Sequence, residues 1–260
     1  MIAQSFDAFL FDLDGVVYVG EQALTGAPEA LKKLRQMNKI IRFVTNNPCT
    51  TREKVKEKLA RLNIEANVDE VVTASSATAE YLFKKNITNA YILGDEHLKS
   101  ECERYDIIHT ESCAEAVVVG WDGKVTFNEI ATVSRLIRNG AYFIATNEDK
   151  TFPMPDGPAP ATGTIVRAIE TASEKRAIII GKPYAAMFQT AMNGIHKHQK
   201  AIMIGDTPTT DILGAHQFGI PAILIGNESN DFQNVQDILE KPDVTIPNLT
   251  ELFNASINMI

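Results

Sequence analysis

Residues 6–17 read F-D-A-F-L-F-D-L-D-G-V-V, and this stretch decides the fold. Residues 9–11 form an apolar run with the length and composition of a buried strand. Two carboxylates, Asp12 and Asp14, follow directly, and Gly15 ends the strand. Such a D-x-D-G pattern taken alone also fits an ordinary turn. Because like charges a few ångströms apart raise each other's pKa, we expect a cation near this pair if both side chains serve one site.

The composition limits the class of protein. A chain of 260 residues with 45% hydrophobic content is long enough for one large domain or two modest ones. Its formal net charge of −8, without a Lys/Arg-rich run, argues against a nucleic-acid partner. No apolar stretch approaches the 18 residues of a membrane span, and the N-terminus lacks the pattern of a signal peptide. We therefore expect a cytoplasmic protein with no membrane partner.

The cysteines and histidines carry little functional signal. Cys49, Cys102 and Cys113 are odd in number and widely spaced, which favours reduced thiols over disulfides or a zinc site. Cys49 lies near a candidate active-site turn, but we expect a bystander thiol. His196 and His198 are expected on a helix, where residues two apart face different directions and form no metal pair.

Strand and helix patterns alternate along the whole chain, which is typical of α/β architecture. The i, i+3, i+4 spacing of apolar residues over 28–38 predicts an amphipathic helix, and 40–44 reads as a second buried strand. This unit would cross over right-handed into a parallel sheet. Thr50 and Glu53 form a capping-box pattern that opens a helix extending through Leu62. Further strands are predicted at 71–73, 90–94, 117–120, 142–146, 177–181, 201–205 and 222–226.

The predicted strands are more numerous than we expect in a single sheet. The region 77–176 has an alternation of strand and helix patterns of its own. Within it, Thr126 and Glu129 form another capping-box pattern. We therefore predict a doubly wound, Rossmann-like parallel-sheet core built from residues 1–76 and 177–260. A second α/β domain, residues 77–176, is inserted into it.

Polar side chains follow several of the predicted strands. Thr45 and Asn46 end the second strand, where a hydroxyl and an amide could donate hydrogen bonds to a phosphoryl group. Lys182, in the sequence G-K-P, follows the run 177–181, where a lysine could bind phosphate and keep Asp12 ionised. A Walker loop is excluded, because Arg176 replaces its first glycine and Pro183 stands where Ser or Thr should follow.

The stretch 205–211, G-D-T-P-T-T-D, supplies two more acids. Asp206 ends a strand, Pro208 suits the first turn of a helix, and Asp211 falls about one turn later. Both carboxylates can therefore lie close together at the carboxyl end of the strand. Hard oxygen ligands in this number suit Mg²⁺.

Taken in order, D-L-D-G-V, the strand ending in Thr45, G-K-P and G-D-T-P-T-T-D resemble the motifs of the haloacid dehalogenase superfamily of aspartate-nucleophile phosphatases. These motifs extend from one end of the chain to the other. The inserted domain lies between the second and third motifs, as does the large α/β (C2-type) cap of the NagD and 4-nitrophenylphosphatase group. The resemblance implies a phosphatase of small phosphorylated metabolites, such as sugar phosphates, nucleotides or similar phosphomonoesters, and a possible cap-mediated homodimer.

The resemblance also implies roles for the core residues. Asp12 would be the nucleophile that forms an aspartyl phosphate, and Asp14 the general acid and base. Lys182 would be a third catalytic residue beside Asp12 and Asp14. It would also bind the phosphoryl group, together with Thr45 and Asn46. Mg²⁺ would be held by the Asp12 carboxylate, the Asp14 backbone carbonyl and Asp206, and through water by Asp211.

Selectivity for the leaving group would come from the inserted domain. Trp121 and Asp149 follow strands there and are our candidates for contacts to the leaving group, although core packing explains Trp121 equally well. Similar proteins usually have T-N-P-D where this chain has T-N-E-D, so that Glu148 replaces a proline.

Three other classes of protein use related chemistry. A signalling receiver domain also groups acids, Thr and Lys at strand ends, but its phosphorylated Asp lies on the third strand and it lacks an inserted domain. The metal-free dehalogenases of the same fold do not need Asp14 or Asp206. A non-catalytic sugar-phosphate binding protein is compatible with the sequence.

Overall fold

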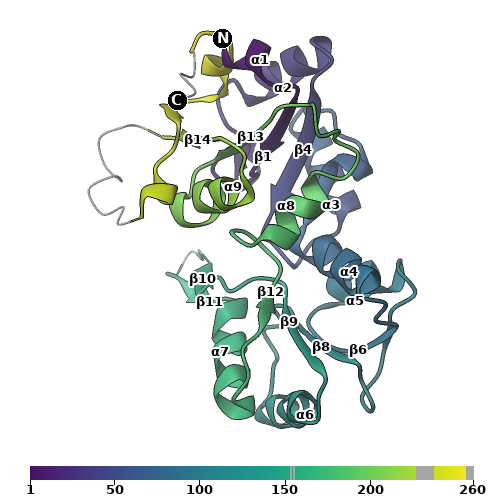
Figure 1. The fold of residues 1–260 in the computed structure, drawn as a ribbon. Helices are drawn as coiled ribbons and strands as arrows, with labels where there is room; N and C mark the ends of the chain where they lie inside the picture. Colours follow the sequence, from purple (N-terminus) through teal and green to yellow (C-terminus); the bar gives the residue numbers. More distant parts are fainter. Residues whose placement is uncertain (153, 155, 227–236, 256–260) are drawn as a thin grey trace. The chain divides into compact units, whose positions relative to one another are not determined.

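The computed structural model describes residues 1–152, 154, 156–226 and 237–255, which form two compact units (Figure 1). The first unit comprises Met1–Thr45, Arg52–Val72 and Lys182–Ile260, and the second comprises Asn46–Thr51 and Thr73–Gly181. The expected inserted range, 77–176, lies within the second unit, and its identification as a cap domain stays a prediction. None of the helices among the described residues is long and apolar enough to cross a membrane.

The first unit contains a six-stranded sheet whose order is β15-β14-β13-β1-β4-β5. Strand β1 pairs in parallel with both β13 and β4, and β13-β14-β15 continue in parallel. The prediction of a parallel α/β sheet is therefore confirmed. The strand bounds are β1 Ala8–Phe11, β4 Ile40–Thr45, β5 Val71–Thr73, β13 Ala201–Gly205, β14 Ala222–Ile225 and β15 Val244–Ile246.

Strand β1 lies between β13 and β4 in the sheet, and the apolar side chains on both of its faces are buried. Phe9 and Phe11 are fully buried in a cluster that includes Leu34 and Leu59, from two helices of the unit. Leu10, which points to the opposite face, is also fully buried. Helices in this unit are α1 Ile2–Ser5, α2 Ala27–Gln36, α3 Arg52–Arg61, α8 Ala185–Ala191 and α9 Leu213–Phe218, with a short hairpin of β2 Tyr18–Val19 and β3 Gln22–Ala23.

The order of the strands creates a switch point beside β1. The chain passes from β1 to β4 on one side and later returns to β13 on the other. In open α/β sheets, ligands bind at such a point, outside the carboxyl ends of the strands. The polar residues that follow β1, β4 and β13 are therefore in the position where a site is expected.

The second unit has its own five-stranded sheet, ordered β12-β9-β8-β6-β7, with parallel pairing. Its capping box is formed as predicted: Thr126 Oγ1 accepts from the Glu129 amide at 3.3 Å, and Glu129 Oε2 accepts from the Thr126 amide at 2.8 Å. The elements are α4 Ala74–Lys84, β6 Asn89–Leu93, α5 Glu96–Glu103, β7 Ile108–His109, β8 Ala116–Val119, α6 Phe127–Arg138, β9 Tyr142–Ala145, β10 Thr151–Phe152, β11 Ala159–Pro160, α7 Thr162–Ser173 and β12 Ile178–Ile179.

One local prediction was wrong. His196 and His198 do not lie on a helix but in the loop between α8 and β13, and their rings stack 5.5 Å apart with an interplanar angle of 7°. Helix α8 ends at Ala191, and a helix cannot extend as far as His196 because Gly194 has a φ of +76°, a conformation that a helix does not contain.

Candidate active site

Strand register brings Asp12 and Asp206 together. Phe11 of β1 lies opposite Ile204 of β13, and the Asp12 amide donates to the Ile204 carbonyl at 2.8 Å. Asp12 and Asp206 are therefore the first residues beyond the ends of two neighbouring parallel strands. Asp12 is buried, whereas Asp206 is exposed.

A π-helical turn, Pro208–Ile212, returns Asp211 to the same place. The Asp211 side chain accepts from the Thr207 amide at 3.1 Å through Oδ2, and only 1% of the residue is exposed. Gly205 makes the approach possible, because a Cβ there would collide with the Asp211 side chain. The predicted placement of proline in the first turn of this segment is confirmed.

Lys182 is the cation beside these acids. Its Nζ donates to Asp12 Oδ1 and to Asp211 Oδ1, each at 2.6 Å, and to the Val44 carbonyl at 3.3 Å. The lysine is 3% exposed. One ammonium group is thus shared by two carboxylates that are 199 positions apart in the chain, counted from residue 12 to residue 211.

Burial dominates the electrostatics of the site. Burial is the largest of the causes that together raise the pKa of Asp12 to about 7; the charge of Lys182 opposes the rise and the charge of Asp211 adds to it. Partial burial and the charge of Asp211 also raise the pKa of Asp206. Burial disfavours the charged form of Lys182, but Asp12 and Asp211 outweigh it and hold its pKa above the ordinary value. Lys182 is therefore charged at neutral pH, and the acids carry excess negative charge.

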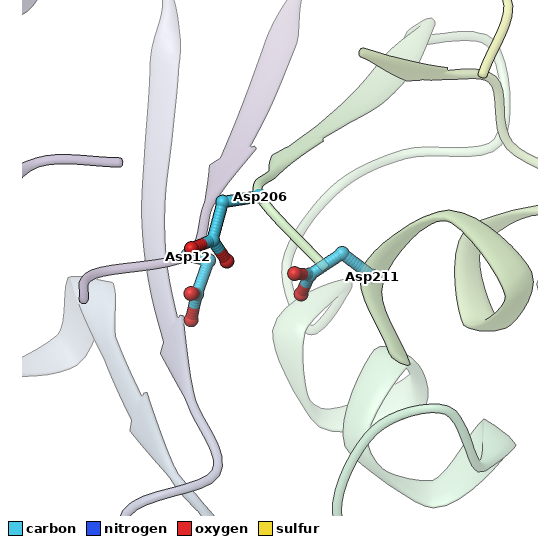
Figure 2. A group of neighbouring side chains, drawn as sticks. All are labelled: Asp12, Asp206 and Asp211. Carbon is cyan, nitrogen blue, oxygen red and sulfur yellow. The ribbon is translucent and has the colours of Figure 1, made fainter. Parts of the chain in front are cut away.

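These residues fit a divalent cation. Asp12, Asp206 and Asp211 each offer a carboxylate oxygen, and the three oxygens lie within 4.8 Å of one another. Figure 2 shows the three carboxylates close together, with Asp12 from the segment after β1 and Asp206 and Asp211 from the segment after β13. With Lys182 included, the ionised group has a net charge of 1 − 3 = −2, and its hard oxygen donors suit Mg²⁺ or Ca²⁺.

Asp14 lies on a tight turn beyond β1. The turn closes through Gly15, whose φ is +83° and whose amide donates to the Tyr18 carbonyl at 2.9 Å. Asp14 is exposed, in contrast to Asp12. Loss of some surrounding water raises the pKa of its carboxyl, while the charges of Lys58 and Lys182 lower it.

Thr45 and Asn46 fall on either side of the boundary between the units. Thr45 is the last residue of β4 and is buried. Asn46 belongs to the second unit, where its carbonyl accepts from Asn147 Nδ2 at 2.8 Å and its Nδ2 lies 3.4 Å from Asp149 Oδ1. The structure thus shows Asn46 engaged with the T-N-E-D segment.

The two candidates for leaving-group contacts are held within the second unit. Trp121 packs edge-on against Phe152, with ring centroids 5.4 Å apart, and its Nε1 donates to the Pro160 carbonyl at 3.1 Å. The Asp149 amide donates to Asn147 Oδ1 at 3.2 Å. Trp121 therefore has the packing role that the sequence also allowed.

Cys49 is half-buried, and burial together with the nearby Asp95 raises the pKa of its thiol to about 12. The thiol is therefore protonated at neutral pH and a poor nucleophile. Among the described residues, Cys49, Cys102 and Cys113 are all free thiols.

Sequence reasoning missed two residues beside Asp14. Tyr18 is 4% exposed, and Lys58 of α3 places its Nζ 3.7 Å from the centre of the Tyr18 ring. A signal was present, because Lys58 lies three residues after Val55 and directly before Leu59, which are both core positions of the helix. A lysine at that place is near the inner face of α3.

Comparison with known proteins supports a phosphatase fold and family. A family model described as haloacid dehalogenase-like hydrolase matches residues 9–108, and a HAD-hydrolase-like model matches residues 179–252. The 5′-nucleotidase YutF of Bacillus subtilis is 30% identical over 250 residues, which cover 95% of this chain and 98% of that protein.

Two solved structures extend the comparison. The 4-nitrophenylphosphatase of Thermotoga maritima has a TM-score of 0.89 and 30% identity, covering 98% of this chain and 99% of that one. The glycerol phosphate phosphatase of Mycobacterium tuberculosis, solved in complex with magnesium, has a TM-score of 0.87 and 30% identity, covering 96% and 77%. The chain therefore belongs to the haloacid dehalogenase-like hydrolases, within the phosphatases that resemble NagD and 4-nitrophenylphosphatase, and is a phosphomonoester hydrolase.

Proposed function

We propose that this enzyme is a Mg²⁺-dependent phosphatase of small phosphorylated metabolites that works through an aspartyl phosphate on Asp12. The observation that carries the proposal is the shared ammonium of Lys182, 2.6 Å from both Asp12 and Asp211, at the end of the central strand. The lysine opposes the effect of burial on the Asp12 carboxylate, which favours its ionised form, and it directs the side chain, as a nucleophile requires.

In the first step, an Asp12 oxygen attacks phosphorus and the bond from phosphorus to the leaving oxygen breaks. Asp14, two residues further and exposed, gives its proton to the departing alcohol. In the second step, water attacks the aspartyl phosphate while Asp14 takes a proton from that water. Breaking the bond between phosphorus and Asp12 then releases phosphate and restores both carboxyl groups.

The remaining core residues orient the phosphoryl group. Lys182 neutralises charge on its oxygens, and Thr45 and Asn46 are the proposed hydrogen-bond donors. The carboxylates of Asp12 and Asp206, with the Asp14 carbonyl, would hold Mg²⁺ directly, and the Asp211 carboxylate would hold it through water. When bound, the ion would reduce the repulsion between the Asp12 carboxylate and an anionic substrate.

The proposed cap is residues 77–176, which lie within the second unit. It would select the leaving group, with contributions from Trp121 and Asp149. The curated and solved relatives carry the names of a 5′-nucleotidase, a 4-nitrophenylphosphatase and a glycerol phosphate phosphatase. Nucleotides, sugar phosphates and similar phosphomonoesters are therefore the first substrates to try. A cytoplasmic location and a homodimer are part of the same proposal, the former supported by the three free thiols.

Turnover of 4-nitrophenyl phosphate tests the mechanism. Wild-type protein should require Mg²⁺ and lose activity in EDTA, and Asp12→Asn should abolish turnover while remaining folded. Activity that survives EDTA or the Asp12→Asn substitution would refute it. A panel of phosphorylated metabolites, compared by kcat/KM, would then identify the substrate class.

A further inference from the structure

The turn that carries Asp14 is fixed by the backbone of Tyr18. The Leu13 carbonyl accepts from the amides of Val17 at 2.9 Å and Tyr18 at 3.1 Å, while the Tyr18 carbonyl accepts from the Gly15 amide at 2.9 Å. Asp14 and Tyr18 also form an isolated β-bridge. Any displacement of Tyr18 would therefore move the backbone that presents Asp14.

Lys58 holds Tyr18 from the adjacent helix α3. Its Nζ lies 3.7 Å from the centre of the Tyr18 ring and 3.7 Å from Glu21 Oε1, so it contacts both β2 and the turn that follows. The Lys58 side chain is 21% exposed and Tyr18 is 4% exposed. A cation over an aromatic face is attracted by the ring, and more strongly when it is partly removed from water.

Packing against Tyr18 does not by itself explain why residue 58 is a lysine. An apolar side chain would pack on the Tyr18 ring without the cost of removing an ammonium from water. The cation over the Tyr18 ring therefore connects α3 to the turn that carries Asp14.

We propose that Lys58 is a positioning residue for proton transfer by Asp14, acting through the Tyr18 ring and the turn of residues 13–18. This inference rests on the proposed function, because it needs Asp14 to protonate the leaving group. It adds a residue from a different element, α3, to the group that controls that step.

The choice of leaving group separates this role from general support of the fold. Phenyl phosphate and 4-nitrophenyl phosphate have nearly the same shape, but nitrophenolate is a weak base that departs without a proton, whereas phenolate benefits from one. The value of kcat/KM reports phosphoryl transfer and the steps before it. A misplaced Asp14 should therefore slow phenyl phosphate selectively.

The experiment compares four proteins on both substrates. Lys58→Met should lower kcat/KM for phenyl phosphate by about 10-fold or more and for 4-nitrophenyl phosphate by no more than about 3-fold. Lys58→Arg, which retains the charge, should recover most of the loss. Asp14→Asn should show the same selective pattern as Lys58→Met. Lys56→Met, an exposed lysine on the same helix, is the matched control and should behave as wild type on both substrates.

The outcomes are distinct. Equal losses on the two substrates, or no loss, with Lys58→Met would overturn the inference. If Lys58→Met fails to fold, Lys58→Gln provides the same comparison with a polar side chain. Asp12→Asn measured in parallel must abolish both activities. If it does not, the proposed function fails; if it does and selectivity is absent, only the role of Lys58 fails.

Discussion

Gly15 lies so close to the Asp206 carboxylate that a methyl group on its Cα would collide with it. Gly15 also has a φ of +83°, a conformation that L side chains rarely adopt. This glycine therefore meets two requirements at once: it turns the chain after Asp12, and it leaves room for an acid that arrives from the other end of the sequence.

Gly15→Ala should therefore destabilise the protein through backbone strain and should also displace Asp206. We expect a loss of about 1–3 kcal/mol in the free energy of unfolding and a loss of phosphatase activity, because Asp206 is displaced. Gly219→Ala is the control, since Gly219 has a φ of +87° and open space around it. It should lose stability without losing activity in the folded state. Urea unfolding and turnover of 4-nitrophenyl phosphate check both expectations, and equal activity of the two variants would contradict the collision.

Lys182 should couple strongly to Asp211 because one ammonium serves two buried carboxylates. Lys182→Met in metal-free buffer at pH 8 should lower the free energy of unfolding by about 3–5 kcal/mol, since the acids are left uncompensated. Adding Asp211→Asn removes one of those acids. The double variant should therefore be less destabilised than the sum of the single variants, by about 1–3 kcal/mol. Additive effects in this cycle would mean that the two side chains do not interact.

The metal-free protein should lose stability as pH rises from about 4 to about 7, relative to Asp12→Asn. Asp12 has a pKa of about 7 in the folded state against 3.8 ordinarily, so its contribution is fully present below pH 3.8. Between these values the unfolded state releases the proton first and becomes favoured. We expect a differential change of roughly 2–4 kcal/mol, measured by urea unfolding in EDTA. Glu57→Gln, an exposed acid on α3, should keep the wild-type slope.

Divalent cations should stabilise the fold through the three carboxylates. Mg²⁺ at 100 times its Kd should raise the free energy of unfolding by about 2.7 kcal/mol, which a thermal melt detects as a higher Tm. Asp206→Asn removes one ligand and should shift the required Mg²⁺ concentration upward, by about 10-fold or more, as expected for loss of a charged ligand. Glu57→Gln should respond as wild type does. A Tm that is insensitive to Mg²⁺ would contradict the metal site.

The T-N-E-D segment should be held by an ion pair in place of the proline. Glu148 pairs with Arg167, whose Nη1 also lies 2.6 Å from Glu170 Oε2. Arg167→Met should raise amide hydrogen exchange over residues 147–150, with less than about 1 kcal/mol of global destabilisation because the pair is near the surface. Arg138→Met is matched, since both arginine side chains are 54% exposed and Arg138 pairs with Glu174 instead. Unchanged exchange in Arg167→Met would rule out this tether.

Local sequence determined the elements and the ends from which the site is built. The apolar run before Asp12 specifies a buried strand, and the capping box at Thr126 specifies where α6 begins, because each depends only on neighbouring residues. Parallel strands also place their carboxyl ends at one edge. Thr45, Asp12 and Asp206 could thus be assigned to that edge from the sequence.

Tertiary structure decided which of these side chains meet. The contact of Lys182 with both Asp12 and Asp211, the clearance at Gly15 and the placement of Lys58 over Tyr18 depend on strand order and helix packing between residues at least 29 positions apart in the sequence. Residue patterns report which face of an element is apolar, but they contain no distance between elements. Close packing supplies those distances, and with them the burial that raises the pKa of Asp12 and the charge that keeps Lys182 beside it.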